Sequence, residues 1–196
     1  MIPIIIPTLD ADLPERIVAQ LGEPGVDLDC GVHVVHDQVE QGFTRTVNEG
    51  LRWALDETDA QHIAIMSDDC KPQTDGWLAA LIDALNDDEA NGFAAPLMPC
   101  RTPGVMGQKP VNNRKIVEHW AVPYGCVLIR RAVFRDVGLL DPVYAHYCSD
   151  TDHQYRSRLF GWRSVVCWHV YVDREVHPPR QPMWSKDQAV LKRRWG

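Results

Sequence analysis

The sequence predicts an α/β protein with a mostly parallel central sheet and helices on both faces. Short apolar segments rich in β-branched residues alternate along the chain with segments whose apolar side chains recur at helical spacing. The 196 residues are 45% hydrophobic and 24% charged, which suits a chain that buries a sizeable core. In folds of this class, ligands gather at the carboxyl ends of the strands.

The first half of the chain shows this alternation most clearly. We expect buried strands at 2–6, 32–35 and 62–66, and a further strand at 92–96. We expect helices at 13–21, 44–55 and 75–85, the last with Thr74 as its N-cap.

The second half begins with a stretch that has no periodicity. Residues 98–120 gather proline, glycine and asparagine, which indicates a long irregular loop of the kind that forms lids or binding loops. After it we expect strands at 125–129 and 165–176, and helices at 131–137 and 150–160, the second capped by Ser149 or Asp150. Because no linker interrupts the chain, we expect a single domain over 1–196.

Charge and cysteine content limit the class of function. A net charge of −7 and a pI near 5.5 argue against a protein that holds nucleic acid through an extended basic surface, but not against a local groove. The six cysteines occur singly, without a CxxC pair, and we interpret them as reduced thiols of a cytoplasmic protein. No apolar run is long enough for a signal peptide core or a membrane span.

The sequence also lacks several well-known catalytic and nucleotide-binding motifs. It contains no GxxxxGK[ST] phosphate loop, no GxGxxG after the first strand, no GxSxG and no HExxH. These absences remove P-loop enzymes, Rossmann dehydrogenases, α/β-hydrolases and zincins from consideration.

Two adjacent carboxylates, Asp68 and Asp69, directly follow the expected strand at 62–66. Like charges side by side repel, and a hard divalent cation that also contacts phosphate oxygens would relieve this repulsion. The alternative is a solvated acidic turn before the next helix. Spacing alone does not decide between the two.

A second acidic pair, Asp150 and Asp152, stands at the start of an expected helix. Helix N-termini favour carboxylates, so capping is one interpretation. A general base that takes a proton from an attacking hydroxyl is the other. The histidines show no metal-binding spacing, but His169 or His177 could fold back toward Asp69.

Several segments form a recognisable series. They are IIIPTLD at 4–10, GFTRTVNEG at 42–50, IAIMSDDCKP at 63–72 followed by GWL at 76–78, GCVLIRRAVF at 125–134, VGLLD at 137–141, SDTD at 149–152 followed by Arg156, Gly161 and Trp162, and the closing KRRWG. In their order and spacing they resemble the inverting glycosyltransferases of family 2, which have the GT-A fold. The resemblance spans nearly the whole chain.

The resemblance implies transfer of a sugar from a nucleotide-diphosphate donor to an acceptor nucleophile, with inversion at the anomeric carbon. It implies a nucleotide-sugar-binding half at about 1–97 and an acceptor-binding and catalytic half at about 98–196. Asp150 would be the general base, and Asp69 would bind Mn²⁺ or Mg²⁺ together with His177, which we prefer to His169. The implied donor-binding residues are Pro7, Thr8, Asp10, His36, Asp37, Arg45, Asp68 and Asp69.

The acceptor side is less specified. Trp120 and Tyr124 could form a stacking platform or could be packing residues. The resemblance adds Gly125, Cys126 and Asp152 as expected acceptor-binding residues. No residue selects among a small glycoside, a protein and a modified nucleic acid as the acceptor.

Two departures from the family pattern support a rival function. Ser67 and Ser149 stand where the family often has acidic residues, so the chain could be a non-catalytic module that binds sugar nucleotides or glycans. A nucleotidyltransferase is a second rival, but the chain lacks a glycine-rich, basic nucleotide-binding signature near its N-terminus.

Overall fold

A computed structural model describes residues 1–10, 12, 30–99, 115–174 and 180–196. The helix expected at 13–21, most of the loop expected at 98–120, and His177 lie outside the described residues.

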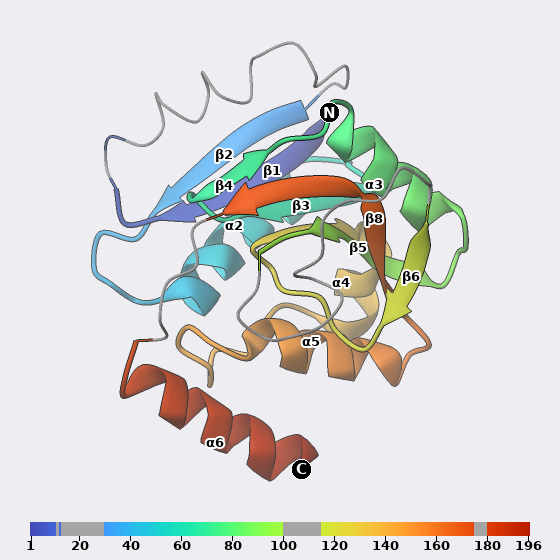
Figure 1. The fold of residues 1–196 in the computed structure, drawn as a ribbon. Coiled ribbons are helices and arrows are strands. Elements are labelled where there is room, and N and C mark those ends of the chain that lie inside the picture. Colours follow the sequence, from blue (N-terminus) through green and yellow to red (C-terminus); the bar gives the residue numbers. More distant parts are fainter. Residues whose placement is uncertain (11, 13–29, 100–114, 175–179) are drawn as a thin grey trace.

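The described elements are strands interspersed with helices along the chain (Figure 1). The strands are β1 (Ile2–Thr8), β2 (Cys30–His36), β3 (His62–Met66), β4 (Cys70–Pro72), β5 (Asn91–Leu97), β6 (Ile116–His119), β7 (Cys126–Arg130) and β8 (Arg163–Arg174). The helices are α2 (Phe43–Glu57), α3 (Trp77–Asn86), α4 (Arg131–Val137), α5 (Ser149–Arg158) and α6 (Met183–Trp195).

The strands form a mixed sheet in the order β2-β1-β3-β7-β5-β8-β4, and β6 pairs with residues 164–167 in the first half of β8. Strand β1 is parallel to β2 and β3, whereas β7 is antiparallel to both β3 and β5. Because two reversals cancel, β5 and its parallel neighbour β8 run in the direction of β1. The expectation of a mostly parallel α/β sheet is confirmed in strand direction, and β4, β6 and β7 run the other way.

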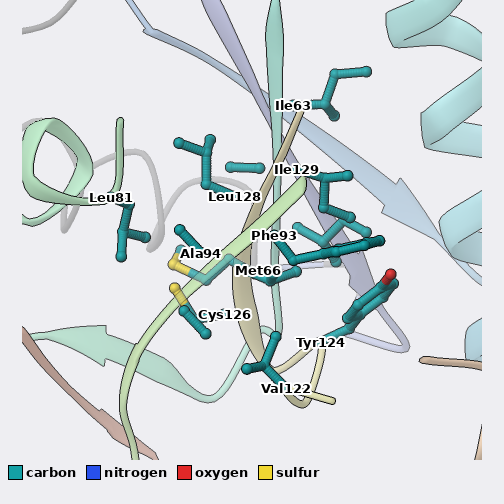
Figure 2. Packing of buried hydrophobic residues seen from close by; sticks show 14 of the residues in the cluster. Ile63, Met66, Leu81, Phe93, Ala94, Val122, Tyr124, Cys126, Leu128 and Ile129 are labelled. Carbon is teal, nitrogen blue, oxygen red and sulfur yellow. The ribbon is translucent and has the colours of Figure 1, made fainter. Parts of the chain in front are cut away.

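Helices cover both faces of the sheet centre. Successive residues on a strand point to opposite faces, and Figure 2 shows Leu81 of α3 on the side of Ala94 and Leu128. On the other face, the ring of Phe93 lies 5.8 Å from that of His153 on α5. The core therefore lies in two layers, one on each side of β5 and β7.

Some elements differ from the sequence expectations for identifiable reasons. Strand β2 is mostly half-buried rather than fully buried, because it ends the described sheet order. Short β4 and β6 pair with β8, at places where the sequence shows only an acidic turn and an irregular loop. Both strands pair with residues far away in the sequence, so no local sequence pattern predicts these pairings.

The helix starts also differ. The Thr74 hydroxyl accepts a hydrogen bond from the Tyr171 backbone N–H at 2.9 Å and does not cap α3, which begins after Gly76. Helix α5 begins after Cys148, whose φ of 65° is left-handed, and neither Ser149 nor Asp150 is its N-cap. The C-terminal helix α6 lies outside the elements that the sequence predicts. Among the described helices, none is long and apolar enough to cross a membrane.

Candidate active site

The carboxyl ends of β1 and β3 bring Thr8 and Asp68 together. The Thr8 hydroxyl donates a 2.7 Å hydrogen bond to Asp68 Oδ2 and accepts one from the Asp10 backbone N–H at 2.9 Å. Pro7 precedes Thr8 and is buried in β1. Four of the expected donor-side residues thus lie at one edge of the sheet, where α/β proteins bind ligands.

The end of β2 adjoins the same edge. The Asp37 backbone N–H donates to the Thr8 carbonyl at 2.8 Å, and His36 Nε2 lies 3.3 Å from the Leu9 carbonyl oxygen. The buried Asp37 carboxylate accepts hydrogen bonds from the backbone N–H groups of Gln41 and Gly42 at 2.8 and 2.9 Å. Asp37 therefore shapes the turn into α2, and recognition of a base by its carboxylate stays a prediction.

Gly42 closes this turn against the loop that precedes α5. Its φ of 93° is left-handed, and a Cβ at this position would lie 2.5 Å from the Ala145 carbonyl oxygen. A residue without a side chain is therefore needed here.

Arg45 lines a surface hollow to which neither Thr8 nor Asp68 contributes. It is exposed on α2, and the hollow has a volume of about 450 Å³. Among the described residues, no hydrogen bond or ion pair joins Arg45 to Thr8 or Asp68. Its expected donor contact stays a prediction. The other residues that line the hollow are Gln41, Asn48, Glu49, Arg52 and Pro142.

Asp69 is paired with an arginine that sequence reasoning missed. Arg174 Nη2 lies 3.2 Å from Asp69 Oδ2, and the two side chains are 27% and 21% exposed. The partners are separated by 105 residues, so no spacing in the sequence signals the pair.

The dipeptide Tyr124-Gly125 connects this ion pair to Asp150. The Gly125 carbonyl accepts hydrogen bonds from the Ser67 backbone N–H at 2.7 Å and from Cys70 Sγ at 3.0 Å. The Tyr124 backbone N–H contacts the Asp150 carboxylate. The two expected acidic sites therefore lie on either side of a single short segment.

Asp150 is half-buried in the first turn of α5. Burial raises the pKa of its carboxyl, and hydrogen bonds from Thr151 and from the Tyr124 backbone only partly oppose this rise. The Thr151 backbone N–H donates to Asp150 Oδ1 at 2.7 Å. A carboxylate with a raised pKa is a better proton acceptor than an exposed one.

Burial corrects the expected role of two acceptor-side side chains. Tyr124 and Cys126 are each 1% exposed and belong to the core shown in Figure 2. Tyr124 is a packing residue whose hydroxyl lies 2.7 Å from His153 Nδ1, so it offers no stacking platform. Gly125 is also buried, and its carbonyl is occupied by the contacts described above.

Asp152 is fully buried and does not face the surface. Burial alone would raise the pKa of its carboxyl, but hydrogen bonds from Arg194, Trp195 and Arg156 hold that pKa below its ordinary value. The Arg194 and Trp195 contacts measure 2.8 and 2.9 Å and attach α6 to α5. Asp152 is thus a structural anchor, which corrects its expected acceptor contact.

Trp120 is the expected acceptor residue that does reach the surface. It is 71% exposed, and the Arg158 guanidinium lies 4.4 Å above its ring. With Glu118, His119 and Arg158 it lines a hollow of about 250 Å³. An exposed aromatic face of this kind suits a sugar ring, and the acceptor contact of Trp120 stays a prediction.

The carboxylates of the site suit a divalent cation that is held jointly by protein side chains and by the phosphate oxygens of a bound substrate. Within the described part of the chain, no three His, Cys, Asp or Glu side chains cluster closely enough to hold a metal ion. Mg²⁺ is nevertheless often held by one or two carboxylates together with substrate phosphates, and Mn²⁺ prefers the same oxygen ligands. Asp69, with Asp68 beside it, provides this minimal set.

The comparison with protein families gives a match, whereas the comparison with curated proteins does not. The family model described as Glycosyl transferase family 2 matches residues 10–138. A search of curated proteins finds no match.

Solved structures show the same fold at low sequence identity. A crystal structure of GalNAc-T7 with UDP, GalNAc and Mn²⁺ has a TM-score of 0.68 at 13% identity, and the match covers 97% of this chain and 47% of that one. The mannosyltransferase PcManGT from Pyrobaculum calidifontis, in complex with GDP-Man and Mn²⁺, has a TM-score of 0.62 at 14% identity, with coverages of 94% and 59%. A197 from STIV has a TM-score of 0.60 at 12% identity, with coverages of 90% and 87%. The chain thus spans about half the length of the first of these structures.

Proposed function

We propose that this chain, which belongs to glycosyltransferase family 2, is a metal-dependent inverting enzyme that transfers a sugar from a nucleotide-diphosphate donor. Its GT-A fold supports this proposal, because α/β sheets bind their ligands at the carboxyl ends of the strands and Asp68 and Asp69 follow the carboxyl end of β3.

One observation carries the proposal. Tyr124 contacts Asp150 through its backbone N–H, while the next residue, Gly125, contacts the segment that bears Asp69. A base and a diphosphate site must flank one anomeric carbon in an inverting transfer, and the contacts of both acidic segments with Tyr124-Gly125 support such an arrangement.

The chain's own residues supply most of the chemistry. Asp150 accepts the proton of the acceptor hydroxyl as its oxygen attacks the anomeric carbon, and the bond from that carbon to the diphosphate oxygen breaks on the opposite face. Thr8 and Asp68 orient the nucleotide. A divalent cation bound at Asp69 would supply positive charge to the departing diphosphate.

The test is nucleotide release by the purified protein. The structural neighbours were solved with UDP and with GDP-Man, so UDP-sugars and GDP-sugars with Mn²⁺ or Mg²⁺ are the first substrates to assay. Asp150→Asn should lower turnover by about 10²- to 10⁴-fold with nucleotide binding retained. Asp69→Asn should abolish the cation dependence of nucleotide binding.

The matched control is Asp56→Asn, an exposed carboxylate on α2. It should match the wild type in both assays. Full turnover by Asp150→Asn would refute the base assignment, and cation-dependent binding by Asp69→Asn would refute the metal assignment.

A non-catalytic sugar-nucleotide or glycan-binding module is the alternative function. It is favoured by Ser149, whose buried hydroxyl has no hydrogen-bond partner among the described residues and stands where the family often has an acid. This alternative predicts sugar-nucleotide binding without release of the nucleotide. The proposed acceptor remains a small glycoside, a protein or a modified nucleic acid, and the proposed location remains the cytoplasm.

A further inference from the structure

Arg174 lies beside Asp69 at the candidate donor site, although nothing in the sequence pattern assigns it a role. It ends β8, where it pairs with Cys70 of β4. Its guanidinium rests on the backbone of Gly125, because a Cβ added there would lie 2.4 Å from Arg174 Nη1. The contact with Asp69 places the same guanidinium at the acidic turn.

The guanidinium has unused hydrogen-bonding capacity. An arginine carries five N–H donors in a planar fork, and among the described residues the Asp69 contact is its one hydrogen bond to a side chain. The Nε of Arg174 is buried and has no partner in the described part of the chain. Buried donors are normally satisfied, and a planar fork suits the paired oxygens of a phosphate.

The Arg174 guanidinium changes the net charge of the acidic turn that contains Asp68 and Asp69. Asp68 and Asp69 together with the Arg174 guanidinium leave the turn with a net single negative charge, which repels a diphosphate. A divalent cation reverses that sign only if Arg174 is present, since two carboxylates alone would neutralise the ion.

We propose that Arg174 is a diphosphate-binding residue of the donor site, which holds Asp69 in the ligand-free protein and competes there with the divalent cation. This inference rests on the proposed function and deepens it. The ligand class is a nucleoside diphosphate, alone or as part of a sugar nucleotide. When the cation takes Asp69, the guanidinium is released toward the phosphate oxygens.

Two binding titrations on the full chain test this inference without an activity readout. Isothermal calorimetry with Mn²⁺ alone should show binding about two- to fivefold tighter in Arg174→Gln than in the wild type, because a partly exposed competitor has been removed. Titration of UDP and GDP at saturating Mn²⁺ should show binding about tenfold weaker or more, because hydrogen bonds from a charged group are lost. Simple damage to the site would weaken the binding of both ligands, whereas the proposed role of Arg174 predicts tighter binding of Mn²⁺ and weaker binding of the nucleotides.

Arg163→Gln is the matched control, since Arg163 begins the same strand and pairs with Asp88. It should leave both titrations unchanged. Arg174→Lys keeps the charge and the aliphatic packing if the glutamine variant is poorly folded. It should retain the wild-type Mn²⁺ affinity and bind the nucleotides more weakly.

The outcomes separate this inference from the proposed function. Wild-type nucleotide affinity in Arg174→Gln, or unchanged Mn²⁺ affinity, would overturn the role of Arg174 and leave the proposed function standing. Absence of UDP and GDP binding by the wild type would overturn the proposed function itself, and this inference with it.

Discussion

The carboxylate of Asp187 on α6 accepts hydrogen bonds from the backbone N–H groups of His146 and Tyr147, at 2.9 and 2.8 Å. A third bond comes from the Ala145 backbone N–H at 3.1 Å. Asp187 is 3% exposed, so these contacts are shielded from water. The C-terminal helix thus fixes the loop that leads to Asp150, from outside the segment matched by the family model.

Asp187→Asn should destabilise the protein. The neutral amide accepts weaker hydrogen bonds than the carboxylate and presents an N–H₂ group to donors that need an acceptor. We expect a loss of about 2 kcal/mol in the free energy of unfolding, measured by urea titration. Lys186→Gln, on the exposed side of the same helix, is the control and should change it little. Equal stability in both variants would show that the three contacts contribute nothing net.

The raised pKa of Asp150 predicts the pH dependence of transfer. The base acts only when deprotonated, and burial raises the pKa at which it takes up a proton. Turnover should therefore fall as the pH drops, with a midpoint above the ordinary aspartate value of 3.8. The pH profile of kcat/KM measures this midpoint, and nucleotide binding over the same range is its control. A profile that stays flat down to the ordinary value would contradict the assignment.

His153 predicts a separate pH dependence, of stability. Its Nε2 donates to the Gly138 carbonyl at 2.9 Å, so Nδ1 is left to accept from the Tyr124 hydroxyl and the ring is neutral. Burial lowers its pKa from 6.5 to about 4. Between these values the unfolded chain binds the additional proton, so stability should fall by about 3 kcal/mol as the pH drops through this window.

The measurement for His153 is the difference between the wild type and His153→Gln in urea titrations from pH 7 to pH 4. The glutamine cannot titrate, so the variant should lose this component of the pH dependence whatever its stability at neutral pH. Parallel pH curves for the two proteins would show that His153 is not the titrating group.

The sequence predicts local elements well and long-range contacts poorly. The strand at 62–66 and the helix at 131–137 match their structural bounds because hydrophobic periodicity is a local signal. Acidic residues at strand and helix ends also mark Asp68, Asp69 and Asp150 as site candidates.

What could not be predicted depends on distant partners. Arg174 acquires its role from Asp69, and Asp187 from a loop about 40 residues earlier in the chain. Asp152 reads as a surface acid in a helix start, yet residues from α6 bury it. A sequence pattern shows the chemical type of a side chain, whereas these roles are decided by which strand or helix packs against it.

Gly50→Ala separates packing from helix propensity. Alanine in a helix interior is favoured over glycine by about 1 kcal/mol. At this position, however, the new Cβ would lie 2.4 Å from Ile5 Cγ2 and 3.0 Å from Val35 Cγ2. Ile5 is fully buried and β-branched, so its methyl group cannot swing away. We expect a net loss of about 1–3 kcal/mol on urea unfolding, with the exposed neighbour Glu49→Ala as the control. A net gain would mean that β1 and α2 can move apart.

Gly125→Ala tests whether the position of the Arg174 guanidinium matters, independently of its charge. The new Cβ would lie 2.4 Å from Nη1, which is the end of a long side chain and can move away at little cost in stability. The fold should therefore persist while the guanidinium leaves Asp69. We expect weaker binding of UDP and GDP at saturating Mn²⁺ and tighter binding of Mn²⁺ alone, as in Arg174→Gln. The double variant should be no worse than either single one, because both remove the same contact. Additive losses would mean that Gly125 acts on the nucleotide by another route.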